Sequence, residues 1–106
     1  MDTFTALAEP TRRNIMELLV VSGNLSATDI YNKFKASPPA ISQHLKVLRE
    51  ANLVRVEKRA QKRIYYVNPA PMKELEIWIK RFTAEWQERH DALEDLLKNQ
   101  MHKHAR

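Results

Sequence analysis

Residues 37–48 read Ser-Pro-Pro-Ala-Ile-Ser-Gln-His-Leu-Lys-Val-Leu, and this stretch decides how the chain is expected to fold. Serine favours the N-cap of a helix and proline its first turn, so a helix is predicted to begin at Pro38 with Ser37 as its cap. Ile41, Leu45 and Leu48 recur at helical spacing and are predicted to face the core. The polar side chains between them are left facing outward, where they can contact another molecule.

The segments before this stretch predict three more helices. A short apolar turn covers residues 4–8, and a second helix begins near Pro10 and ends at Gly23, the only glycine, where a helix stop favours a positive φ. Ser26 is predicted to cap a third helix, whose apolar face would be Ala27, Ile30, Tyr31 and Phe34. A three-residue connection, residues 35–37, then leads into the helix that starts at Pro38. Two short helices joined so tightly predict a helix-turn-helix.

After Asn52, which is suited to a left-handed helix stop, the periodicity changes to that of strands. Residues 53–57 and 63–67 predict a β-hairpin with a turn at 59–62. The period then becomes helical from about 72 to 100. We therefore predict a mainly α fold with a small β-hairpin, a winged helix-turn-helix of five helices and a two-stranded wing, over residues 1–100, and a disordered tail at 101–106.

The charge is concentrated in the middle of the chain. The 106 residues carry a net charge of +5, but residues 33–63 hold nine Lys or Arg against two Glu, a net of +7, which leaves −2 for the remainder. A basic centre favours a polyanion partner, most often nucleic acid. The absence of cysteine fits a reducing cytosol, and neither a signal peptide nor a spanning helix is indicated, so a cytoplasmic protein without a membrane role is expected.

Three motifs carry a resemblance to a known family. They are Ala-Leu-Ala-Glu-Pro-Thr-Arg-Arg-Asn-Ile at 6–15, the segment 39–54, and Arg-Ile-Tyr-Tyr-Val at 63–67. Together they resemble the ArsR/SmtB family of bacterial transcriptional repressors, and the opening motif with the long last helix is similar to the SdpR-like branch. The resemblance implies homodimers that bind operator DNA and usually repress transcription. The sequence departs from the family pattern at two places. Its wing turn lacks glycine, and Asn52 stands at a helix stop where glycine is frequent.

The expected DNA-binding residues lie on the helix at about 38–50 and on the wing at about 55–66. Short hydrogen-bonding side chains near the start of such a helix reach base edges in the major groove, which suits Ser42 and Gln43, whereas Lys46 and Arg49 suit phosphates. His44 lies between the two faces and either touches DNA or packs against the third helix. The wing is expected on a minor groove or its phosphates. The full set is Ser37, Pro39, Ser42, Gln43, His44, Lys46, Arg49, Arg59, Gln61, Lys62 and Arg63.

The last helix is longer than a core of this size can cover, so part of its apolar stripe is predicted to meet a second copy of the chain. The expected dimer interface comprises Phe4, Leu7, Trp78, Phe82, Trp86 and Leu93. The alternative interpretation of the aromatic stripe Trp78, Phe82 and Trp86 is a small-molecule pocket between the helices.

Metal sensing and catalysis receive little support from the residues. The third helix has no cysteine, and Glu88, His90 and His102 are only weak candidates for a metal site on the last helix. No cofactor is expected, no inducer is identified, and neither a phosphate-binding glycine loop nor a nucleophile with a histidine partner occurs, so an enzyme is not expected. The alternatives to a DNA-binding repressor are a protein-interaction module with the winged fold and a metal- or ligand-responsive repressor.

Overall fold

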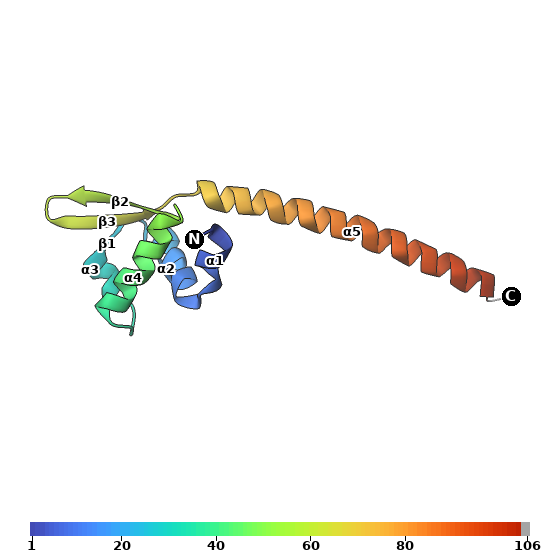
Figure 1. Ribbon diagram of the computed structural model, residues 1–106, viewed down its shortest axis with the longest axis horizontal. Helices are drawn as coiled ribbons and strands as arrows, with labels where there is room; N and C mark the ends of the chain where they lie inside the picture. Colours follow the sequence, from blue (N-terminus) through green and yellow to red (C-terminus); the bar gives the residue numbers. More distant parts are fainter. Residues whose placement is uncertain (105–106) are drawn as a thin grey trace. The chain divides into compact units, whose positions relative to one another are not determined.

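The computed structural model describes the backbone of residues 1–104 and the side chains of residues 1–101. Five helices and three strands follow one another along the described residues (Figure 1). Their bounds are α1 Thr3–Ala8, α2 Pro10–Ser22, β1 Leu25–Ser26, α3 Ala27–Tyr31, α4 Pro38–Glu50, β2 Val54–Arg59, β3 Lys62–Val67 and α5 Ala70–His104. The chain divides into two units, residues 1–73 and the part of α5 from Glu74 onward, and each is described by itself.

The first two helices begin at acidic caps. Asp2 accepts the N–H of Thr5 at 2.8 Å to start α1, and Glu9 accepts the N–H of Arg12 at 3.1 Å to start α2. A carboxylate at a helix N-terminus also meets the positive end of the helix dipole. Gly23 ends α2 with a φ of 78° and donates its N–H to Leu19, so the predicted helix stop is confirmed.

The third helix is shorter than its apolar pattern indicated. Ser26 caps it as predicted by accepting the N–H of Asp29, but α3 ends at Tyr31, and Phe34 packs on the core from the following turn. The connection to α4 is therefore residues 32–37, six residues instead of the expected three. Hydrogen bonds from the N–H groups of Lys33 and Phe34 back to the end of α3 hold this turn.

The fourth helix begins and ends as its sequence predicts. Ser37 accepts the N–H of Ala40, and Pro38 is the first helical residue. At the other end Asn52 has a φ of 62° and donates its N–H to Arg49, while the N–H of Leu53 reaches Leu48 at 2.9 Å. These are the two hydrogen bonds of a Schellman motif, in which asparagine takes the place that glycine usually holds.

The sheet has three strands where two were predicted. The order is β1-β3-β2, and both pairings are antiparallel, with Leu25 opposite Tyr65 and Ser26 opposite Ile64. The strand β1 was not predicted, because its two residues are too few to show a period. In the hairpin Arg59 pairs with Lys62, so the turn is only Ala60 and Gln61. Ala60 has a φ of 55°, a conformation that is costly for an L residue other than glycine.

One hydrophobic core joins the helices to the sheet. It is built from one or more residues of α1, α2, α3, α4, β2 and β3, together with Leu53. Ile41, Leu45 and Leu48 of α4 are each no more than 1% exposed, so the core-facing side predicted for this helix is confirmed. The core members are Ala6, Ile15, Met16, Leu19, Ile30, Ile41, Leu45, Leu48, Leu53, Val54 and Tyr65.

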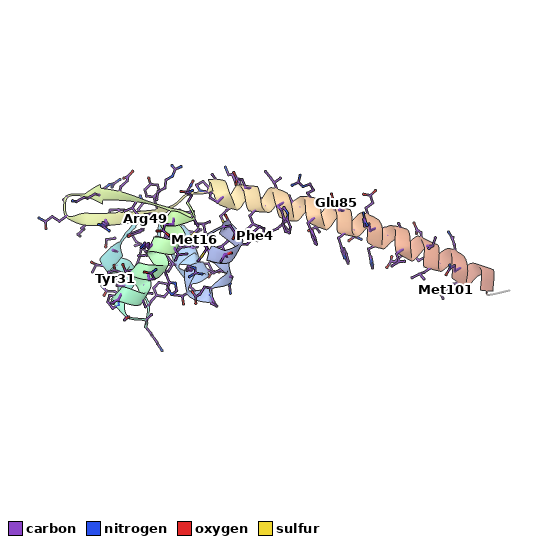
Figure 2. All side chains as sticks on the ribbon, in the orientation of Figure 1. Phe4, Met16, Tyr31, Arg49, Glu85 and Met101 are labelled. Carbon is purple, nitrogen blue, oxygen red and sulfur yellow. The ribbon has the colours of Figure 1, made fainter. Side chains whose placement is uncertain are left out.

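The last helix is a single element of 35 residues. It begins two residues before the predicted start and continues to His104, so residues 101–104 are helical rather than part of a tail; residues 105–106 lie outside the described residues. Side chains project from all sides of α5 (Figure 2). At 1.5 Å per residue this helix is about 50 Å long. No helix in the described part of the chain combines the length and apolar character needed to cross a membrane.

Candidate nucleic-acid interface

The outward side of α4 carries the polar residues that the sequence assigned to DNA. Ser42, Gln43, Lys46 and Arg49 are all exposed, while the opposite side of the helix is buried in the core. Gln43, Lys46 and Glu50 follow at i, i+3 and i+7, so they form one line along the helix. Glu50, at the far end of that line, is acidic, and no role was predicted for it from the sequence. It would repel phosphates, which favours contact through the first half of the helix.

The start of α4 offers few backbone donors for an anion. Pro38 and Pro39 have no N–H, and the N–H of Ala40 is bound by the Ser37 hydroxyl. The N–H of Ile41 donates to the Ser37 carbonyl. Any contact of this helix with an anion would therefore be made by its side chains. Ser37 and Pro39 are both exposed, and Ser37 already acts as the cap.

His44 packs against the junction of α1 and α2, not against α3 as one expectation had it. Its Nδ1 lies 3.3 Å from an Arg12 guanidinium nitrogen and 3.8 Å from a Glu9 carboxylate oxygen. The side chain keeps 23% of its surface exposed. The structure thus joins α4 to the start of α2, a link between residues at least 32 positions apart that no local pattern indicates.

Glu9 is the acidic member of this junction. Partial desolvation acts to raise the pKa of its carboxyl, but the N–H of Arg12 and the nearby His44 act against it. The net result is a pKa below the ordinary glutamate value, so the carboxylate form is favoured at the start of α2.

The tip of the wing gathers four cations around a two-residue turn. Lys58 lies opposite Arg63 and Arg59 opposite Lys62, so both faces of the hairpin present a pair of like charges. Like charges directly opposite one another destabilise a hairpin, and a bound anion would relieve that repulsion. Arg59, Lys62, Arg63 and the tip residue Gln61 are exposed, as expected for phosphate contact. Lys58 was missed because its partner becomes evident only from the register.

One wing cation is partly neutralised within the protein. Arg59 forms an ion pair with Glu57 at 3.2 Å, and the hydroxyl of Tyr66 donates to the same carboxylate at 3.4 Å. Both members of the ion pair are largely exposed, so the pair contributes little to stability. Lys58, Lys62 and Arg63 are therefore the stronger candidates for phosphates.

The predicted dimer residues are mostly exposed. Phe4, Trp78, Phe82, Trp86 and Leu93 are between 45% and 56% exposed, whereas Leu7 is partly buried against the core. Within α5 the rings of Trp78 and Phe82 stack with centroids 5.3 Å apart. Leu96 and Leu97 extend the same exposed stripe.

The weak metal candidates are not brought together. Glu88 and His90 are two positions apart on α5 and so point in different directions, and the side chain of His102 lies outside the described residues. His90 instead pairs with Glu94 at 3.1 Å and stacks on Trp86 with centroids 4.8 Å apart. No group of three or more potential metal ligands occurs among the described residues.

A shallow apolar pocket of about 280 Å³ was not anticipated from the sequence. It lies between α2, the end of β3 and the first turn of α5, and it is lined by Met16, Glu17, Val20, Val21, Val67 and Met72. This volume is slightly below the usual range for small-molecule sites. The pocket does not involve the aromatic stripe that had suggested a ligand.

These features define a class of protein. A helix-turn-helix anchored in the core, an exposed polar side on its second helix and a cationic β-hairpin are the parts of a winged-helix DNA-binding protein. The sequence profile for "Bacterial regulatory protein, arsR family" matches residues 9–56.

The chain is also similar to known transcriptional regulators. The chain is 33% identical over 81 residues to the transcriptional repressor SdpR of Bacillus subtilis, an alignment that covers 76% of this chain and 89% of SdpR. It is 39% identical over 77 residues to the HTH-type transcriptional regulator Rv2034 of Mycobacterium tuberculosis, covering 73% and 71% of the two chains. Among solved structures, an ArsR-like transcriptional regulator from Rhodococcus sp. RHA1 aligns with a TM-score of 0.77 and 28% identity over 88% of this chain and 87% of that chain.

The chain belongs to the ArsR family. It is accordingly a sequence-specific DNA-binding transcriptional regulator and not an enzyme, and the resemblance noted in its sequence motifs is confirmed.

Proposed function

We propose that this protein is a homodimeric repressor that places α4 in the major groove of operator DNA and the wing on the flanking minor groove or backbone. The observation that carries the proposal is the pairing of an exposed polar side on α4 with four cations at the wing tip. One α-helix fits the major groove, and the negative potential of a narrow minor groove attracts Arg and Lys. Because the matching family is described as bacterial, and bacterial DNA lies in the cytoplasm, we propose that compartment for the protein.

Base recognition falls to Gln43 and Ser42 in this arrangement. Gln43 lies at the centre of the exposed side of α4, and its amide can pair with adenine through two hydrogen bonds. Lys46, one turn further, supplies affinity through phosphate without sequence information. Arg49 either reaches phosphate too or only balances the dipole at the C-terminus of α4, where it occupies the last turn.

Dimerisation is supported by the exposed stripe of α5. Six large apolar side chains of this stripe are between 45% and 58% exposed, and such side chains along one side of a helix favour a partner helix. They are Trp78, Phe82, Trp86, Leu93, Leu96 and Leu97. A dimer with its two α4 helices facing the same side of a duplex would bind half-sites about 34 Å apart. Binding to the operator of a promoter is the usual means of repression by such dimers.

Footprinting on the DNA upstream of the protein's own gene tests the DNA arrangement. We expect protection of two half-sites about one helical turn apart, and Gln43→Ala should relax base preference within them. A single protected half-site, or an unchanged preference at every base pair in Gln43→Ala, would contradict the placement of α4.

The dimer is tested separately by sedimentation. Trp86→Glu places a charge in the stripe and is expected to give monomers, whereas Ile77→Glu serves as the matched control because Ile77 is 64% exposed on the opposite side of α5. Dimers that persist in Trp86→Glu would refute this interface.

A further inference from the structure

Arg12 holds a fixed position at the junction of α1 and α2. Its Nε donates to the carbonyl of Ala6 at 2.6 Å and its Nη2 to the carbonyl of Thr5 at 3.3 Å. Both carbonyls belong to the last turn of α1, where helix carbonyls lack partners within the helix. Two nitrogens of the guanidinium are therefore bound to α1, and the third, Nη1, contacts His44.

The contact between Arg12 and His44 determines which ring nitrogen carries the proton. A guanidinium has only donors, so Nδ1 of His44, 3.3 Å from Nη1, acts as the acceptor. In the neutral ring the proton is then on Nε2. The Glu9 carboxylate, at 3.8 Å, is too far from Nδ1 to accept a hydrogen bond and compete for this arrangement.

The other ring nitrogen, Nε2, is not enclosed by the protein. The contacts of His44 in the described part of the chain, to Arg12 and Glu9, both go through Nδ1. No buried side-chain nitrogen or oxygen among the described residues lacks a hydrogen-bond partner, so Nε2 reaches solvent. It does so from the residue that follows Gln43, at the edge of the exposed side of α4.

From this geometry we propose that His44 donates its Nε2–H to an acceptor oxygen or nitrogen of DNA, and that Arg12 is the positioning residue that fixes the required tautomer. The inference rests on the proposed placement of α4 on DNA. It also gives a role to an arginine of the opening sequence motif, which lies 32 residues before His44. The acceptor is either a phosphate oxygen or a base-edge atom such as guanine N7 or O6 or thymine O4.

The tautomer is read by ¹⁵N–¹H correlation NMR of the free protein at pH 8.5. We expect the Nε2–H pattern in the wild type and a mixture of tautomers in Arg12→Met, which removes the donor. Arg13→Met is the matched control, because Arg13 likewise donates to α1 carbonyls, those of Leu7 and Ala8, at 2.6 and 3.1 Å. The Arg13→Met variant should lose hydrogen bonds to α1 of the same kind and keep the wild-type tautomer of His44. A single Nε2–H tautomer in Arg12→Met would overturn the proposal.

DNA affinity tests the donor itself. An asparagine amide takes the place of Nδ1 and a glutamine amide that of Nε2, so His44→Asn should bind the operator about 10-fold more weakly per protomer while His44→Gln stays close to wild type, in line with one lost hydrogen bond. Arg12→Met should weaken binding only by the inverse of the fraction of rings that keep the Nε2–H tautomer, about 2-fold for an equal mixture, and adding His44→Gln to Arg12→Met should restore it. Failure of this rescue, or equal affinities of His44→Asn and His44→Gln, would overturn the proposal.

Two further measurements separate the possible outcomes. If the contact is to phosphate, His44→Asn weakens operator and random duplexes equally; if it is to a base, only the operator is affected, and either result supports the donor role. Gln43→Ala and Lys62→Ala report on the placement of α4 and the wing. If these two lower the affinity and His44→Asn does not, the inference about His44 fails and the proposed function stands; if none of the three has an effect, the proposed function fails.

Discussion

Replacing Lys62 with alanine removes one of the four cations at the wing tip and is expected to weaken DNA binding by a calculable amount. The side chain is exposed, lies opposite Arg59 and forms no ion pair in the described part of the chain. If it neutralises one phosphate, its loss reduces the slope of log K against log salt by about 0.9 per protomer, and by about 1.8 for a dimer. At about 0.1 M salt this corresponds to roughly 8-fold weaker binding per contact and about 60-fold for two.

Fluorescence anisotropy over a salt series, with operator and random duplexes, measures both quantities. The loss should be the same on both duplexes, because phosphate contacts carry no base information. Lys80→Ala is the control, since it removes the same charge from a lysine of α5 that is already paired with Glu76 at 2.8 Å. A slope equal to that of the wild type, or a loss confined to the operator, would refute the assignment of the wing to phosphates.

The same assay applies to a second variant, which is expected to bind DNA more tightly instead of more weakly. Glu57→Gln removes the carboxylate that pairs with Arg59 at 3.2 Å, so it should release that guanidinium for phosphate. We expect a steeper salt slope and tighter binding to both duplexes.

Four further predictions concern the helices. Glu50→Gln removes an acid from the exposed line of α4 and should strengthen binding to all duplexes; weaker binding in anisotropy would argue that Glu50 itself contacts DNA. Ser26→Ala deletes the cap of α3 and should lower the free energy of unfolding by about 1 kcal/mol in urea titrations. Leu48→Ala, at a fully buried position, should cost about 2–5 kcal/mol in the same assay, and a loss below 1 kcal/mol would contradict its place in the core. Because the pKa of Glu9 is lowered by folding, its stabilising contribution is complete above the ordinary carboxyl pKa of about 4.3 and is lost as the pH falls through the folded value, so Glu9→Gln should flatten the acid side of the stability profile measured by circular dichroism.

Local chemistry explains why so much of the fold could be predicted. A cap, a proline at the first turn and a left-handed stop depend on residues within a few positions of each other, and Ser26, Ser37, Pro38, Gly23 and Asn52 all act as their positions indicated. The core side of α4 follows from its apolar period in the same way. The end of α3 was placed too late because its pattern continued into Phe34, whose packing comes from the turn and not from the helix.

Long-range pairing explains what could not be predicted. The strand β1 exists only because it pairs with β3, and the residue types of Leu25 and Ser26 do not by themselves indicate a strand. Asn68 is buried and donates its side-chain N–H to the carbonyl of Asn52 at 2.8 Å, which ties the end of β3 to the stop of α4. Such contacts join residues that are distant in the chain, so they cannot be predicted from periodicity or spacing.

The sequence by itself determined the class of this protein: the order of its helices and of the hairpin, the buried side of α4, the polar residues opposite and the cationic wing all follow from short-range patterns of charge and hydrophobicity. Only the tertiary structure decided which of those residues lie next to one another. The hairpin register sets Lys58 against Arg63, and the approach of Arg12 to His44 chooses the side on which the imidazole donates. The physical reason is that caps and stripes are properties of one segment, whereas strand register and the tautomer of a histidine depend on which distant group the fold brings within hydrogen-bond distance.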